Sequence, residues 1–247
     1  QGLIAGINAA MEILGREPLV LDRSEAYIGV LIDDLVTKEN HEPYRMMTSR
    51  AEYRLLLRQD NADLRLTKKG YEIGLISKER YDWVCKKEQM IKEEIDRVAK
   101  VHVGANKEVQ ALLESYGSIP LNTGVTLTEL MRRPELDYDK LAPIDHERSE
   151  LPEEVREQVN ILIKYDGYIS RQIKQVESFK KLEKKKIPEG FDYDEVPSLR
   201  IEARQKLKLY SPTSIGQASR ISGVSPADVS VLLVYMEQMN HHGEHHS

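Results

Sequence analysis

A chain of 247 residues, of which 40% are hydrophobic and 31% charged, can bury a substantial core and does not have the composition of a disordered protein. The formal net charge of −5 means that any nucleic-acid contact has to come from local basic patches. No apolar stretch is long enough to cross a bilayer, and the single cysteine, Cys85, excludes an intrachain disulfide. We therefore expect a cytoplasmic protein that makes no contact with a membrane.

Hydrophobic periodicity and capping residues predict a mainly α-helical chain. Ser24 is a candidate N-cap, Ser49 and Glu52 have the spacing of a capping box, and Pro152 suits the first turn of a helix. Residues 225–228 supply an N-cap, a proline and an acidic third position for the last helix. The stretch 101–138 is more broken and predicts short helices or strands. The longer predicted helices cover residues 2–14, 25–41, 49–58, 78–98, 152–186, 198–209, 213–222 and 226–240.

The first candidate site is a row of arginines. Arg50, Arg54 and Arg58 follow one another at four-residue steps, so they would share one face of the helix predicted over 49–58. Guanidinium groups in a row can bind phosphates bidentately, and Tyr44 and Tyr53 could stack on bases. The alternative is a solvated stripe whose charges are paired with neighbouring carboxylates. The candidate RNA-binding residues in this region are Arg45, Arg50, Arg54, Arg58 and Arg65.

A second candidate site mixes aromatic and basic side chains along the helix predicted over 152–186. Such interleaving suits single-stranded RNA, because bases stack on the rings while cations contact the phosphates. The lysines from residue 180 onward more often mark only the end of a soluble helix. The candidate RNA-binding residues here are Tyr165, Tyr168, Arg171 and Lys174.

Residues 214–228 predict a helix, a glycine turn and a capped helix. Helix-turn-helix modules have this arrangement, and so do many hairpins that dock proteins. Arg220 is the single basic residue of this segment, which favours docking of a protein over reading of DNA. The candidate partner-binding residues are Gly216, Gln217, Arg220, Ile221 and Val224.

The sequence predicts no catalytic set and no metal site. Asp33 and Asp34 point about 100° apart on a helix, so they do not form a dyad that shares a proton. Cys85 is expected to be a buried structural thiol on the apolar side of its helix. The histidines after residue 240 favour a disordered tail over a metal site. There is no glycine-rich dinucleotide loop and no Walker loop.

Several strings of this sequence closely resemble the C-terminal part of the MnmG (GidA) family, the bacterial tRNA uridine 5-carboxymethylaminomethyl modification enzymes. The resemblance implies an FAD-binding Rossmann-type domain upstream, NADH as reductant, a homodimer and a GTPase partner, MnmE. Gln1 and Gly2 resemble family contacts to FAD, and the arginine segment resembles part of the tRNA-binding surface. The strings that carry the resemblance are residues 1–10, 27–37, 42–58, 60–66 and 216–228.

This resemblance implies three parts in the chain. Residues 1–22 would be the last helix of the FAD domain, 23–150 a helical linker and central region, and 151–247 a C-terminal helical domain with a small terminal bundle. Because the chain starts at Gln1 without an initiator Met, we interpret its start as a cut. We expect tRNA and GTPase binding rather than catalysis, and no FAD bound by this chain alone. The alternative is a purely structural module for dimerisation or protein docking.

Overall fold

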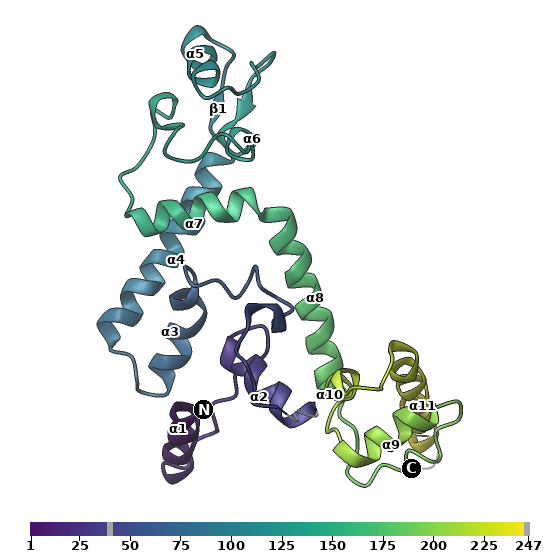
Figure 1. Cartoon of the computed structure of the whole chain (residues 1–247). Helices are drawn as coiled ribbons and strands as arrows, with labels where there is room; N and C mark the ends of the chain where they lie inside the picture. The colour runs from purple at the N-terminus through teal and green to yellow at the C-terminus, as the bar shows by residue number, and fades with distance from the viewer. Residues whose placement is uncertain (39–41, 245–247) are drawn as a thin grey trace. The chain divides into compact units, whose positions relative to one another are not determined.

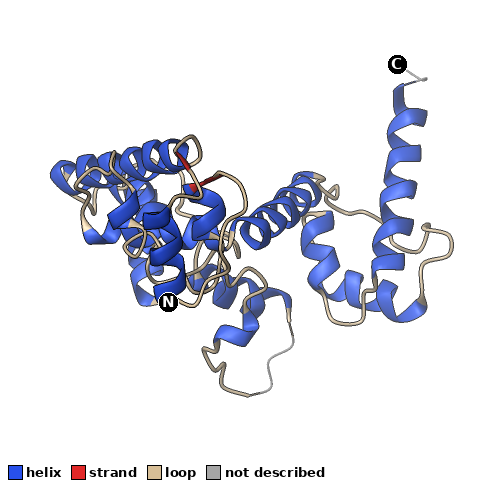
Figure 2. Ribbon diagram, turned by 90° about the horizontal axis from the view of Figure 1, so that it is seen from above, coloured by secondary structure: helices blue, strands red, loops and turns tan. Residues whose placement is uncertain are grey.

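The structure is a computed structural model and describes residues 1–38 and 42–244 (Figure 1). Helices, blue in Figure 2, form most of the described chain, and the short strands are drawn in red. The predicted fold class, mainly α, is therefore confirmed. The histidines after residue 240, for which the sequence predicts a tail, lie outside the described side chains.

The described chain consists mainly of separate helices that follow one another in the sequence. The described helices are α1 (Gly2–Ile13), α2 (Tyr27–Thr37), α3 (Ala62–Glu72), α4 (Lys78–Val98), α5 (Lys107–Ser115), α6 (Leu127–Met131), α7 (Glu153–Lys164), α8 (Asp166–Lys184), α9 (Ile201–Tyr210), α10 (Ile215–Arg220) and α11 (Pro226–Glu244). Two 3-10 turns, η1 (Thr48–Arg50) and η2 (Ala142–Ile144), and two strands, β1 (His102–Val103) and β2 (Val125–Thr126), complete the series. The strands pair antiparallel, with His102 opposite Thr126.

Contacts divide the chain into two compact units. We call residues 1, 20–54 and 172–247 the bundle unit, and residues 2–19 and 55–171 the central unit. Helix α8 begins in the central unit and ends in the bundle unit. Each unit is described by itself below.

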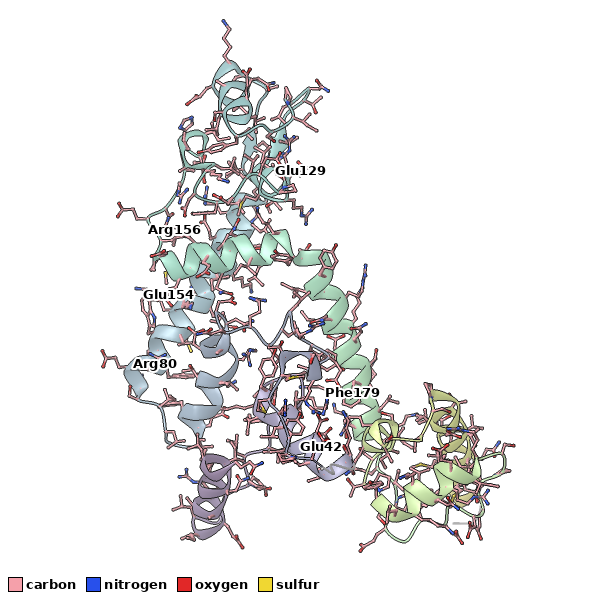
Figure 3. The ribbon with its side chains drawn as sticks, viewed as in Figure 1. Glu42, Arg80, Glu129, Glu154, Arg156 and Phe179 are labelled. Carbon is pink, nitrogen blue, oxygen red and sulfur yellow. The ribbon has the colours of Figure 1, made fainter. Side chains whose placement is uncertain are left out.

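The central unit is built around α4, which packs against α3, α6 and α7. Its apolar core combines residues from the long helices with residues from the short elements between them, among which Leu113, Leu130 and Leu136 have no solvent exposure. Helix α6 starts with a capping box, since Thr126 accepts from the backbone of Glu129 and the Glu129 carboxylate accepts from the backbone of Thr126. Figure 3 labels Glu129 at this position.

The bundle unit has its core in the last three helices. Leu207 of α9, Ile215 of α10 and Leu232 of α11 are fully buried against one another. The predicted cap of the last helix is present, because Ser225 Oγ accepts from Asp228 N at 3.3 Å and Asp228 Oδ2 accepts from Ser225 N at 2.8 Å. Arg200 adds a bidentate pair to the same carboxylate, with its shortest contact at 2.6 Å. Asp228 therefore joins the start of α9 to the start of α11.

The helix predicted over 49–58 is wrong, because the helical part of this segment is only the short turn η1. The carboxylate of Glu52, which the capping box needs, instead accepts two hydrogen bonds from Arg23, at 2.6 and 3.2 Å. A tertiary ion pair thus outweighs the local capping preference. The predicted Ser24 cap is wrong as well, since Ala26 occupies the N-cap position of α2 and makes no side-chain cap.

The single helix predicted over 152–186 is also wrong, because the structure has two helices there. Tyr165 ends α7, with φ −104° and ψ 11°, and Asp166 opens α8. An acidic residue is favourable at a helix N-terminus, and Gly167 is a poor residue for a helix interior, so both favour a break at this place. Pro152 is the N-cap residue of α7, one position before the predicted first turn.

The thiol of Cys85 is exposed, so the predicted buried cysteine is wrong. The buried face of α4 follows a helical spacing that passes through Val84 and leaves Cys85 about 100° away from it. Two positions of this face are polar, and one of them, Lys87, pairs with Asp63 at 2.8 Å and Glu154 at 2.7 Å. The buried residues of α4 are Val84, Lys87, Ile91, Glu94 and Val98.

We predict that Gly29→Ala destabilises the bundle unit. A Cβ atom at Gly29 would lie 2.4 Å from the carbonyl oxygen of Asp22 and 2.5 Å from that of Leu21, so the backbone would have to shift. The free energy of unfolding should fall by about 1–3 kcal/mol. Gly6→Ala in α1 is the control, because its Cβ would meet no atom within 4 Å. Urea unfolding followed by circular dichroism tests this, and a Gly29→Ala variant as stable as the parent would contradict it.

We predict that the stability of the bundle unit depends on pH because of Asp228. Its hydrogen bond to Arg200, aided by those to Ser225, outweighs burial and holds the pKa of Asp228 well below its ordinary value. A lowered folded-state pKa gives stability that is present above about pH 4 and is lost as the pH falls further. Asp228→Asn should unfold about 1–3 kcal/mol more easily at pH 7. The gap from the parent should narrow in thermal unfolding scans between pH 4 and pH 2.5, and a constant gap would contradict the assignment.

Candidate nucleic-acid interface

The arginine segment of the bundle unit is held by one buried guanidinium, that of Arg23, which is 5% exposed. Arg23 Nη1 donates to Asp33 at 2.9 Å and to Asp34 at 2.6 Å, and Nη2 donates to Glu52 at 2.6 Å. Burial lowers the pKa of Arg23, but the hydrogen bonds to Glu52 and Asp34 outweigh it and raise the pKa further above its ordinary value. Arg23 therefore connects Glu52, in the segment 42–54, to the two aspartates of α2.

Tyr44 connects this buried cluster to the exposed arginines. Its hydroxyl donates to Asp34 Oδ2 at 2.7 Å, and its ring lies under the guanidinium of Arg50, with Cζ 4.2 Å from the ring centroid. Arg50 Nε in turn donates to the backbone oxygen of Arg45 at 3.0 Å. Burial, followed by the hydrogen bond to Asp34, raises the pKa of Tyr44 to about 12, so the hydroxyl stays protonated at neutral pH.

The exposed arginines of this segment are Arg45, Arg50 and Arg54. Within residues 1–38 and 42–244, none of these three side chains forms an ion pair with a carboxylate. Tyr53 is 9% exposed, so its predicted stacking on a base is wrong. The segment can therefore present guanidinium groups to an anion, although not along the single helix face that the sequence predicted.

Arg58 and Arg65 lie in the central unit and bond within it. Arg58 Nε donates to both oxygens of Asp60, at 3.0 and 3.2 Å, and its Nη2 donates to Gln158 Oε1 at 3.2 Å. Arg65 Nη2 donates to the backbone oxygen of Arg58 at 2.9 Å, and its Nε donates to Asn61 Oδ1 at 3.0 Å. These contacts hold the turn that precedes α3.

The second candidate set consists of Tyr165, which ends α7, and of three residues on α8. Tyr165 and Tyr168, in the central unit, are 46% and 60% exposed, and Arg171 is exposed one turn further on. Lys174, in the bundle unit, is exposed as well. In the part of the chain that the structure describes, neither Arg171 nor Lys174 forms an ion pair. Accessible aromatic and cationic groups on α8 are consistent with the prediction of RNA contact but do not test it.

The predicted docking residues of the terminal hairpin are largely internal to the bundle unit. Gly216 and Ile221 are buried, and Arg220 bonds to Asp33 at 2.6 Å and to Glu183. The guanidinium of Arg220 also lies 4.8 Å from the ring of Phe179, which Figure 3 labels on α8. Gln217 and Val224 are half-buried. Partner binding by this set stays a prediction.

The predicted FAD contacts, Gln1 and Gly2, are exposed at the start of α1, and a Cβ atom added at Gly2 or Gly6 would meet no atom within 4 Å. FAD contact by these two residues stays a prediction. The described residues contain no group of three or more metal-ligating His, Cys, Asp or Glu side chains, and none of their helices has the length and hydropathy that a membrane span requires.

Two family models match the chain. Residues 78–173 match the tRNA modifying enzyme MnmG/GidA C-terminal helical domain, and residues 175–247 match the MnmG/GidA C-terminal helical bundle. The chain belongs to the MnmG/GidA family. The two matched domains meet inside α8, whereas the three-part division predicted at 22/23 and 150/151 stays a prediction.

Individual relatives agree with this assignment. The tRNA uridine 5-carboxymethylaminomethyl modification enzymes MnmG of Lachnoclostridium phytofermentans and Caldicellulosiruptor saccharolyticus are 69% and 62% identical, over 97% and 96% of this chain and 38% of each relative. The structure of Aquifex aeolicus GidA in its form II crystal superposes with a TM-score of 0.76 at 44% identity, over 95% of this chain and 37% of that one. The chain thus spans about two fifths of the length of MnmG/GidA relatives and corresponds to their C-terminal portion.

We predict that Arg58→Gln destabilises the central unit, whereas Arg54→Gln changes stability little. Arg58 is half-buried and bonds to Asp60, Gln158 and the backbone, and glutamine cannot replace these contacts. The loss should be about 1–3 kcal/mol for Arg58→Gln and within about 0.5 kcal/mol for the exposed Arg54. Urea unfolding of both variants measures the difference, and equal stabilities would contradict this division of roles.

Proposed function

We propose that this chain is the tRNA-binding and partner-docking part of a flavoprotein that installs the carboxymethylaminomethyl group on the wobble uridine of tRNA. The observation that carries the proposal is the set of exposed arginines, Arg45, Arg50 and Arg54, which form no ion pair with a carboxylate among the described residues, and of which Arg50 is held by Tyr44 and by the Arg45 backbone. Guanidinium groups of this kind bind phosphate oxygens through two parallel hydrogen bonds. The names of the relatives supply the reaction class.

In this proposal the chain positions tRNA and leaves the redox chemistry to other parts of the protein. FAD, with NADH as reductant, would be bound by an upstream domain of the longer protein, which would act as a cytoplasmic homodimer. The chain's own contribution would be contacts from Arg45, Arg50 and Arg54 to phosphates, together with RNA contacts from Tyr165, Tyr168, Arg171 and Lys174. Arg58 and Arg65 would act indirectly, by holding the turn in front of α3.

The proposed protein partner is the GTPase MnmE, docked on the bundle unit. Exposed apolar side chains on this unit support a docking role, since Ile201 and Leu209 of α9 are 73% and 67% exposed and Val234 of α11 is exposed too. The predicted residues Arg220 and Ile221 would then shape the unit rather than touch the partner. The same apolar positions also favour the second candidate function, a structural docking or dimerisation module without RNA contact.

We predict that Arg54→Gln and Arg171→Gln each weaken tRNA binding about tenfold near 0.1 M salt, because each removes a charge-assisted contact to phosphate. The slope of log affinity against log salt should become shallower by about 0.7–0.9 for each variant. Lys86→Gln is the matched control, since it removes one exposed positive charge on α4 outside the proposed surface. Filter binding of labelled tRNA over a salt series measures both quantities.

Two outcomes would count against this function. If the 247-residue chain shows no tRNA binding at low salt, the structural module is the better description. If Lys86→Gln weakens binding as much as Arg54→Gln does, the contact depends on overall charge and not on the proposed surface.

A further inference from the structure

We propose that Tyr44 is a positioning residue that fixes the guanidinium of Arg50 for binding to an RNA phosphate. This inference rests on the proposed tRNA-binding function and adds a residue that does not itself touch the RNA. The sequence suggested a different role for Tyr44, stacking on a base. Its hydroxyl and one face of its ring are instead used inside the protein, by Asp34 and Arg50.

The carboxylate of Asp34, which accepts the hydrogen bond from Tyr44, is itself held in place by other contacts. Asp34 is 1% exposed, and its Oδ1 accepts from Arg23 at 2.6 Å and from Lys38 at 2.8 Å. If Asp34 left this position, a buried guanidinium would lose one of its partners, which is strongly unfavourable. Its second oxygen, Oδ2, therefore offers the Tyr44 hydroxyl an acceptor at a fixed place.

Tyr44 in turn restrains the position of Arg50. The hydrogen bond at 2.7 Å to Asp34 holds the end of the Tyr44 side chain in place, so that the ring stays beside Arg50 and its face supports the guanidinium at 4.2 Å. The hydrogen bond from Arg50 Nε to the Arg45 backbone oxygen sets the rotation of the guanidinium plane. Two contacts of different kinds thus restrain a side chain that is otherwise among the most flexible in proteins.

The terminal nitrogens of Arg50 remain available for a ligand. The ring takes one face of the guanidinium and Arg45 takes Nε, and among the described residues no acceptor binds Nη1 or Nη2. These two nitrogens can donate parallel hydrogen bonds to two oxygens of one phosphate. Because the side chain is already ordered, phosphate binding loses less conformational entropy than it would with a freely rotating arginine.

A double-mutant cycle on the 247-residue chain tests this role, with Tyr44→Phe, Arg50→Gln and the double variant assayed for tRNA affinity over a salt series. Arg50→Gln should weaken binding about tenfold and flatten the salt slope. Tyr44→Phe removes one hydroxyl and no charge, so it should weaken binding about three- to fivefold with an unchanged slope. In the Arg50→Gln background, Tyr44→Phe should have no further effect, because its action passes through Arg50.

Tyr71→Phe in the central unit is the matched control and should bind tRNA like the parent, since it removes a tyrosine hydroxyl far from this support in the sequence. Circular dichroism and thermal unfolding report whether each variant is folded. If Tyr44→Phe does not fold, Tyr44→Leu, which removes ring and hydroxyl together, replaces it in the cycle and should weaken binding at least as much.

The outcomes separate this inference from the function on which it rests. If Arg50→Gln weakens binding while Tyr44→Phe leaves it unchanged, or if the two effects simply add, the positioning role is overturned and the tRNA-binding function stands. If Arg50→Gln has no effect on affinity or slope, the phosphate contact at Arg50 is wrong, and the role of Tyr44 is wrong with it.

Discussion

The geometry of the bundle unit depends on the pairing of a buried cation. Arg23 is surrounded by Asp33 and Asp34 of α2 and by Glu52 of the arginine segment, and removing one partner of such a cluster leaves an uncompensated buried charge. Asp33 also accepts from Arg220 of α10 at 2.6 Å. A segment with little regular secondary structure, residues 42–54, is therefore held by the ion pair of Glu52 with Arg23 and by the hydrogen bond of Tyr44 to Asp34 of α2.

The ion-pair cluster around Arg23 also shows which structural features can be predicted from the sequence and which cannot. Helices α1, α4 and α11 begin and end close to their predicted residues, because periodicity and caps such as Ser225 act within one or two turns. The capping box at Glu52 fails because the competing partner, Arg23, lies 29 residues earlier. Two neighbouring aspartates on an otherwise apolar helix were the available sign of a buried cation. Considered only as a catalytic pair, these aspartates do not indicate a buried cation, and Arg23 is therefore not among the predicted residues.

The candidate site was predictable in residue type but not in geometry. The sequence shows arginines with phosphate-binding chemistry, yet it does not show which of them a carboxylate neutralises. Arg58 and Arg54 look equivalent in the sequence, and the structure gives the first a pair with Asp60 and leaves the second exposed. Likewise, Tyr44 and Tyr53 look like equivalent aromatic groups, but one supports Arg50 and the other is buried. Pairing through space decides these roles.

The same reasoning reconciles a net charge of −5 with the proposed polyanionic ligand. Many of the acidic groups form ion pairs with nearby cations. For example, Glu94 and Asp145 each bind Arg97 at 2.6 Å. Such pairs are nearly neutral at a distance, because the fields of opposite charges a few ångströms apart largely cancel, and salt screens what remains beyond a Debye length of about 8–10 Å. The field that a phosphate meets at close range is then set by the exposed, unneutralised cations rather than by the total charge. Placing Arg50 on a buried aspartate through an uncharged tyrosine keeps that carboxylate's charge away from the guanidinium while still fixing its position.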